Sequence, residues 1–209
     1  MKYTDMTVSE FQQALAASSP TPGGGTASAI SLGHAASLAL MVCRLTKGKE
    51  RWADGWEIAN RVERMAGPLL VHSSNLAQED SEAFDKVMAC FRMPKATDED
   101  KLSRKAAIDA ATLFAAEVPY ETAKSAVRLL ELLPDLARNG NANAVTDVGV
   151  AGLLASAAAK GALFNVHINL NSLPPGEGEH IRQELPVLKE ASRLYSRQVM
   201  DAVRDRMDS

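Results

Sequence analysis

The chain has 209 residues, of which 46% are apolar and 23% are charged, and its formal net charge is −3. This length is enough to bury one ordinary core, so we expect a single domain over residues 1–209. The slightly negative charge excludes the basic surface that nucleic-acid-binding proteins present. Aromatic residues make up only 5% of the chain, which favours closely packed helices over a sheet. The composition predicts an all-α fold.

The start of the chain and its cysteines predict a cytoplasmic protein. The first residues, MKYTDMTVSEF, lack the apolar core of a signal peptide. Cys43 and Cys90 lie far apart within apolar runs, as free thiols do in a reducing compartment. The apolar run 26–45 is long enough to span a membrane, but serine, threonine, histidine and arginine interrupt it. We therefore expect it to be a buried helix, with no membrane partner.

The first half of the chain predicts three helices. Thr7 and Glu10 have the spacing of a capping box, which predicts a helix that begins after Thr7. A Pro/Gly segment follows, and then a helix rich in Ala, Gly and Ser from about residue 26 to residue 46. A long helical pattern covers residues 51–91 and is predicted to bend near Pro68.

The second half predicts further helices and one ambiguous segment. Thr97 is expected to cap a helix that ends before Pro119, where another begins. A second small-residue helix begins near residue 146, and the segment 164–170 fits either its continuation or a short strand. The last helix covers roughly residues 179–207 and is expected to be interrupted or shifted by Pro186.

The two small-residue helices have a shared design. Ala, Gly and Ser recur in both at spacings of three and four, and small side chains allow helix axes to approach closely. We expect these helices to form the central pair of a bundle, or a subunit interface.

Three consecutive glycines, Gly23, Gly24 and Gly25, stand in front of the first small-residue helix. One interpretation is a tight turn between packed helices. The other is a ligand site, because the start of a helix offers free N–H groups to a carboxylate or phosphate, and glycines allow close approach. A P-loop is excluded because no Gly-Lys-Ser/Thr sequence follows, and a dinucleotide site is excluded because no strand precedes the glycines.

Asp80 lies on the apolar stripe of its predicted helix, between Leu76 and Phe84. An unpaired carboxylate is unfavourable there. Such a group has a raised pKa and suits a general base or a counter-charge to a cation. A buried salt bridge, or a position at the partly exposed edge of the stripe, would also explain it. The four histidines and two cysteines have no usual ligand spacing, so no metal site is expected.

Five segments together resemble one family. PTPGGGTASA, LTKGK, EDSEAF, GNANAVTDVGVA and NVHINL occur in this order across nearly the whole chain. They are similar to the cyclodeaminase/methenyltetrahydrofolate cyclohydrolase domain of the formiminotransferase-cyclodeaminase family, in its free-standing form. The resemblance implies an all-helical homodimer that acts on a tetrahydrofolate derivative without a metal or a tightly bound cofactor.

Two reactions are implied by this resemblance. A cyclohydrolase converts 5,10-methenyltetrahydrofolate to 10-formyltetrahydrofolate, and a cyclodeaminase converts 5-formiminotetrahydrofolate to the methenyl form and ammonia. Both pass through a tetrahedral carbon and need proton transfer. We favour the cyclohydrolase, with the cyclodeaminase and a non-catalytic folate-binding or scaffold protein as alternatives.

The resemblance also suggests roles for particular residues. Asp80 and Asp147 are the candidate catalytic carboxylates, although Asp147 could simply cap its helix together with Thr146. Lys47 and Lys49 could hold the glutamate tail of folate beside the glycines, or only balance the helix dipole. The candidate substrate-binding residues are Pro22, Gly23, Gly24, Gly25, Lys47, Lys49, Asn143, Asn165 and Asn169.

Overall fold

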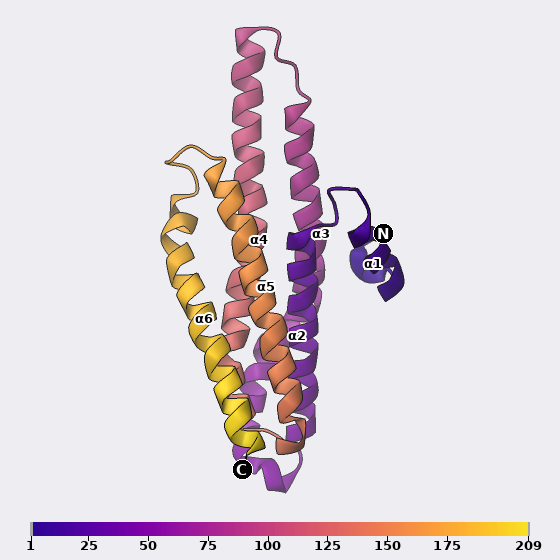
Figure 1. Ribbon diagram of the computed structural model, residues 1–209, viewed down its shortest axis with the longest axis vertical. Coiled ribbons are helices and arrows are strands. Elements are labelled where there is room, and N and C mark those ends of the chain that lie inside the picture. The colour runs from indigo at the N-terminus through magenta and orange to yellow at the C-terminus, as the bar shows by residue number, and fades with distance from the viewer. Residues whose placement is uncertain (1, 209) are drawn as a thin grey trace.

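The computed structural model describes residues 2–208, and within that range the chain forms helices and no strand (Figure 1). The α-helices are α1 (Val8–Ala16), α2 (Gly24–Thr46), α3 (Trp56–Phe91), α4 (Asp98–Asn139), α5 (Val145–Asn171) and α6 (Glu179–Met207). Short 3-10 turns cover Tyr3–Asp5, Glu50–Gly55 and Ala142–Ala144. The predicted all-α class is confirmed.

Helices α2 to α5 form an antiparallel four-helix bundle, and α6 covers one side of it. Each of the four packs on the next, α5 packs back on α2, and α6 lies against α4 and α5. The main core lies between them and contains leucines of α4 such as Leu129 and Leu133 and alanines of α2 and α5 such as Ala35 and Ala155. The two small-residue helices are therefore neighbours in the bundle, as expected.

Glycines of the small-residue helices face serines of adjacent helices. A Cβ atom added to Gly161 of α5 would lie 2.3 Å from Oγ of Ser28 in α2. One added to Gly33 of α2 would lie 2.6 Å from Oγ of Ser73 in α3. The added carbon conflicts only with the hydroxyl in each pair, because the serine Cβ atoms would be 3.6 Å and 3.5 Å away, so glycine leaves each hydroxyl in its present position.

The capping signals locate two helix starts correctly. Thr7 accepts a hydrogen bond from the backbone of Glu10, and Thr97 accepts one from Asp100, so both predicted capping boxes are confirmed. The ambiguous segment 164–170 is helical and belongs to α5. The long third helix begins at Trp56 rather than Arg51, because residues 50–55 form a 3-10 turn with a non-helical Trp52.

The predicted break at Pro119 is wrong. Helix α4 runs without interruption from Asp98 to Asn139 and contains both Pro119 and Pro134. Both prolines are buried, and α4 packs on α3, α5 and α6 along its length. This packing outweighs the penalty of about 3 kcal/mol for each proline in a helix interior.

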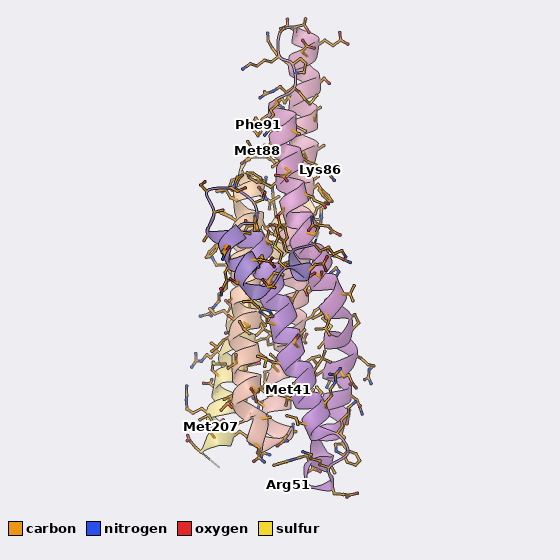
Figure 2. The ribbon with its side chains drawn as sticks, turned by 90° about the vertical axis from the view of Figure 1, so that its right-hand side faces the viewer. Met41, Arg51, Lys86, Met88, Phe91 and Met207 are labelled. Carbon is orange, nitrogen blue, oxygen red and sulfur yellow. The ribbon has the colours of Figure 1, made fainter. Side chains whose placement is uncertain are left out.

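Two parts of the chain extend from the bundle. The end of α3 and the start of α4 project beyond the other helices as a two-helix hairpin (Figure 1). Figure 2 shows Met88 and Phe91 on this hairpin, and Met41 on α2, among side chains with exposed apolar surface. Helix α1 stands beside the bundle and has no buried residue, although its neighbour Thr4 shares a hydrogen bond with Ser74 of α3.

Two stretches, Gly24–Thr46 and Ala142–Asn171, are long and apolar enough to cross a membrane by length and composition. In each of them, 56% of the most apolar window is buried inside the bundle. That burial is typical of core helices in a folded domain.

Candidate functional site

A cavity of about 240 Å³ lies where the start of α2 meets α3, α4 and the end of α5. Its wall includes Asp80, two asparagines and the segment before α2. The lining residues are Pro20, Thr21, Gly23, Gly24, Gly25, Asp80, Phe84, Val87, Ala115, Asn165, Ile168 and Asn169. It therefore brings together six of the candidate site residues, from three helices.

The carboxylate of Asp80 lies directly against the first turn of α2. The Thr26 hydroxyl donates a hydrogen bond to Oδ2 of Asp80 at 3.0 Å, and the Thr26 backbone N–H also interacts with this carboxylate. A Cβ atom on Gly25 would lie 2.1 Å from Oδ1 of Asp80. Gly25 is therefore needed to leave room for the carboxylate.

This contact corrects the expected role of the helix start. We expected the free N–H groups of α2 to attract the carboxylate or phosphate of a ligand. Instead, the anion at this positive helix end is the chain's own Asp80, which interacts with the third residue of α2. The glycines thus admit a protein carboxylate as well as lining the cavity.

The Thr26 hydroxyl also shares a hydrogen bond with the hydroxyl of Ser81. Oγ1 of Thr26 lies 3.0 Å from Oγ of Ser81, and both residues are buried. Since a hydroxyl has one proton and Thr26 donates its proton to Asp80, Ser81 must be the donor in this pair. The hydrogen bonds run from Ser81 through Thr26 to the carboxylate, and such a chain strengthens each bond.

The pKa of Asp80 is raised above its ordinary value of 3.8 because burial disfavours the charged form. Hydrogen bonds from the Thr26 hydroxyl and backbone N–H act in the opposite direction and lower the pKa. Asp80 is the one ionisable side chain in the described wall of the cavity. Its environment suits a carboxylate that accepts and returns a proton.

Two asparagines of α5 line the cavity together with Asp80. Nδ2 of Asn165 donates to the carbonyl oxygen of Gly161 at 2.9 Å, and Nδ2 of Asn169 donates to that of Ala115 in α4 at 2.6 Å. Because a carbonyl oxygen only accepts, these bonds define which end of each amide is the NH₂ group. The amide oxygens remain available, so the cavity presents acceptors to a ligand rich in N–H donors or positive charge.

Four further candidate residues lie at the opposite end of the α2–α5 pair. Lys47 and Lys49 follow the end of α2, while Asn143 and Asp147 lie around the start of α5. Along α5, Asp147 precedes Asn165 by 18 residues, which corresponds to roughly 27 Å at 1.5 Å per residue. The expectation that the lysines lie beside Gly23–Gly25 is therefore wrong within one chain.

Local contacts at that end differ from the expected ones. Lys47 forms an ion pair with Glu63 of α3, whereas Lys49 is exposed. Asp147 lies inside the first turn of α5 rather than capping it, because the helix already begins at Val145. The side chain of Asn141 instead accepts a hydrogen bond from Asn143 and donates one to the carbonyl oxygen of Leu45.

Pro22 is the one candidate near the cavity that does not line it. It is buried, and its neighbours Pro20 and Thr21 line the cavity instead. Phe84, Val87, Ala115 and Ile168 form the apolar part of the wall and were not among the predicted site residues. Phe84 and Val87 could have been predicted, because they belong to the same apolar stripe of α3 as Asp80, whereas no sequence pattern indicated Ala115.

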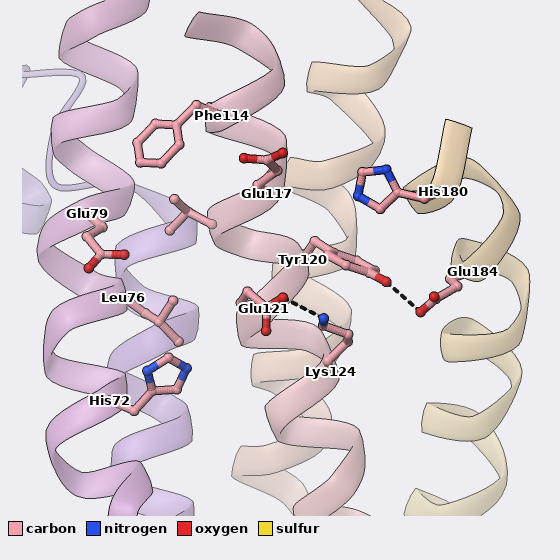
Figure 3. A pocket seen from close by; sticks show the side chains of 11 residues that line it. His72, Leu76, Glu79, Phe114, Glu117, Tyr120, Glu121, Lys124, His180 and Glu184 are labelled. Atoms are coloured by element: carbon pink, nitrogen blue, oxygen red, sulfur yellow. Dashed lines mark hydrogen bonds and ion pairs between the residues drawn. The ribbon is translucent and has the colours of Figure 1, made fainter. Parts of the chain in front are cut away.

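A second hollow, of about 500 Å³, lies between α3, α4 and α6 (Figure 3). Four of its polar side chains are paired with one another: Tyr120 donates to Glu184, and Lys124 pairs with Glu121. Among residues 2–208, no group of three or more His, Cys, Asp or Glu side chains is arranged to hold a metal ion.

Sequence comparisons match most of this chain to one protein family. The family model described as formiminotransferase-cyclodeaminase matches residues 7–184. The chain is 36% identical over 193 residues to a protein of Methylorubrum extorquens named methenyltetrahydrofolate cyclohydrolase, covering 91% of this chain and 93% of that protein. It is 29% identical over 172 residues to the formimidoyltransferase-cyclodeaminase of Rattus norvegicus, covering 81% of this chain but only 31% of the rat protein.

The fold comparison gives the same result. A crystal structure from Thermotoga maritima, described as formiminotetrahydrofolate cyclodeaminase, superposes with a TM-score of 0.85 at 25% sequence identity. The match covers 97% of this chain and 98% of the other. The sequence and fold comparisons together show that this chain belongs to the formiminotransferase-cyclodeaminase family.

Proposed function

We propose that this protein, as one domain over residues 1–209, hydrolyses 5,10-methenyltetrahydrofolate to 10-formyltetrahydrofolate. The observation that carries the proposal is the half-buried carboxylate of Asp80 in a cavity that two asparagine side chains also line. The relative named methenyltetrahydrofolate cyclohydrolase, matched over nearly its whole length, supports the same reaction.

The acceptors of the cavity match the chemistry of this substrate. The reacting carbon is part of a cation between two nitrogens, and a reduced pterin carries several N–H donors. A carboxylate and two amide oxygens complement these groups. The volume of about 240 Å³ is smaller than usual for a whole drug-sized ligand, so it suits the ring system, with the remainder of folate outside.

The proposed mechanism uses protein groups and water. Asp80 accepts a proton from a water molecule as its oxygen attacks the cationic carbon, which becomes tetrahedral. The bond from this carbon to N5 then breaks, and N5 receives the proton back from Asp80. The hydroxyl proton leaves to solvent, which yields the 10-formyl group and balances the reaction.

The alternative reaction uses the same groups. In 5-formiminotetrahydrofolate, N10 attacks the formimino carbon and ammonia leaves, so the tetrahedral carbon and the proton transfers are similar. The family relatives of Rattus norvegicus and Thermotoga maritima, whose names contain cyclodeaminase, keep this candidate open. A non-catalytic folate-binding protein is the third candidate.

We further propose that the protein is a homodimer in which each site is completed by the partner. The outer faces of α2 and α5 carry exposed apolar side chains at helical spacing: Met41, Leu45, Val150, Leu153, Phe164 and Ile168. A surface of this kind typically binds another protein. We call this set the α2–α5 outer face, and a second copy of the chain is its proposed occupant.

Two-fold symmetry gives a reason for the divided site. If the axis crosses the middle of the α2–α5 outer face at right angles to the helices, it exchanges the two ends of the pair. The end with Lys47, Lys49 and Asp147 would then lie beside the partner subunit's cavity. Cys43 and Cys90 are both free thiols, which supports a cytoplasmic location for this dimer.

An optical assay separates the three candidate functions. The near-ultraviolet band of methenyltetrahydrofolate should decay faster with the protein than in buffer if it is a cyclohydrolase. Appearance of this band from 5-formiminotetrahydrofolate would instead identify a cyclodeaminase, and neither change would favour the non-catalytic protein. Asp80→Asn should fold normally and lower kcat by about 100-fold or more, the usual contribution of a general base.

A further inference from the structure

The proline in the middle of α4 has a specific relation to the cavity. Pro119 has no N–H group, so the carbonyl oxygen four residues earlier, that of Ala115, lacks its usual helical partner. Ala115 lines the cavity, and its carbonyl oxygen accepts a hydrogen bond of 2.6 Å from Nδ2 of Asn169. The side chain of α5 thus uses the carbonyl group that the proline leaves free.

The hydrogen bond of Asn169 differs from that of Asn165, one turn earlier in α5. Asn165 bonds to a carbonyl group of its own helix, that of Gly161, whereas the bond of Asn169 crosses from α5 to α4. A bond between helices prevents rotation of the Asn169 amide more effectively than one within its own turn, because it depends on both backbones. The bond therefore fixes the orientation of the Asn169 amide, and Asn169 lines the cavity.

We propose that Pro119 is a positioning residue of this site: by leaving the Ala115 carbonyl group free, it orients Asn169 to accept a hydrogen bond from the substrate. This inference rests on the proposed function. Pro119 itself does not touch the cavity, so its effect acts through Asn169.

Pro134 provides a matched control within the same helix. It is also buried in α4, but the residue four before it, Leu130, lies in the main core rather than in the cavity wall. Replacement of either proline by alanine restores a backbone N–H and removes similar apolar volume. Only the change at position 119 gives the carbonyl oxygen that accepts from Asn169 a second donor, the restored backbone N–H of residue 119.

The experiment compares Pro119→Ala, Pro134→Ala, Asn169→Ala and the double variant Pro119→Ala/Asn169→Ala. For Pro119→Ala we expect a melting temperature no lower than that of Pro134→Ala, and a KM for methenyltetrahydrofolate raised about fivefold, the equivalent of one ordinary hydrogen bond. Pro134→Ala should keep the original KM. The double variant should have the KM of Asn169→Ala, because both changes remove one interaction.

A KM of Pro119→Ala equal to that of Pro134→Ala would overturn the proposal, as would additive effects in the double variant. Binding of tetrahydrofolate, measured by calorimetry, should follow the KM values. If the unmodified protein neither turns over nor binds folates, the proposed function fails. The orientation of Asn169 is then decided by NMR, since hydrogen exchange of its side-chain amide should accelerate in Pro119→Ala and unchanged protection would refute the inference.

Discussion

Gly25 and Asp80 approach each other so closely that a methyl group on residue 25 would overlap the carboxylate, with its carbon 2.1 Å from Oδ1 and 2.6 Å from Cγ. The two residues lie 55 positions apart in the sequence, on different helices. The Asp80 carboxylate can therefore occupy this place only because residue 25 has no side chain.

Gly25→Ala is expected to lose activity without losing the fold. The added methyl group forces the Asp80 carboxylate to rotate away from Thr26, whereas alanine itself is about 1 kcal/mol more favourable than glycine in a helix. We expect kcat/KM to fall at least about tenfold with an unchanged or higher melting temperature. Gly67→Ala in α3 is the control, because no atom lies within 4 Å of its added Cβ, and normal activity in both variants would contradict the prediction.

Asp80→Asn should make the protein more stable near neutral pH. Burial raises the folded-state pKa of Asp80 above its ordinary value of 3.8. The folded state therefore holds this proton more tightly, and the associated stability is complete below about pH 3.8 and is lost as the pH rises through the folded-state pKa. Asparagine stays uncharged throughout.

Thermal unfolding of both forms between pH 4 and pH 8 tests this expectation. The variant should melt a few degrees higher at pH 7, and the difference should shrink towards pH 4. A variant that is less stable at pH 7 would show that the ionised carboxylate supports the fold.

Thr26→Val should move the acid limb of the activity profile to higher pH. The Thr26 hydroxyl lowers the pKa of Asp80, and valine keeps the shape of threonine but removes this hydrogen bond, so the pKa rises further. If Asp80 must be ionised to accept a proton, kcat/KM in the acid limb should fall about tenfold.

Two related variants make this test specific to the hydroxyl. Thr26→Ser retains the donor and should restore the original pH profile, while Ser81→Ala should cause a smaller change in the same direction because it affects only the second hydrogen bond. A uniform loss of activity at every pH would indicate a packing defect instead.

Mixing two inactive variants tests whether the site is shared between subunits. If Asp80 of one chain acts with Asp147 of the other, a mixed dimer of Asp80→Asn and Asp147→Asn contains one site with both carboxylates intact. Random exchange of subunits should then restore about one quarter of the original activity. The mixture would remain inactive if each site belonged to one chain, and sedimentation that detected only monomers would refute the dimer.

Local signals in the sequence were sufficient for most helix boundaries. Thr7 and Thr97 begin helices because their side chains satisfy backbone groups three residues away, an effect that depends on no distant contact. The rule that proline ends a helix is also local. It failed at Pro119 because the continuation of α4 depends on how this helix packs on three other helices. A single-residue preference cannot include this packing energy.

The candidate site was predictable only in part for a similar reason. Gly25, Asp80, Asn165 and Asn169 do meet at one cavity. Lys49 and Asp147 lie at the other end of the bundle. Because α2 and α5 run in opposite directions, the start of α2 lies beside the end of α5, and the end of α2 lies beside the start of α5. Helical periodicity shows which face of a helix is apolar, but it does not show whether a neighbouring helix runs parallel or antiparallel. The sequence alone therefore could not show that the candidate residues lie at two different ends of the bundle.

The pairs Gly161–Ser28 and Gly33–Ser73 link α2 to both of its neighbours in the bundle. Each serine hydroxyl occupies the space that a Cβ atom on the opposite glycine would need. A side chain at position 161 would therefore displace the Ser28 hydroxyl, which now donates a hydrogen bond to the carbonyl oxygen of Gly24 in the first turn of α2. A substitution in the middle of α5 would thus disturb the helix start against which the Asp80 carboxylate lies.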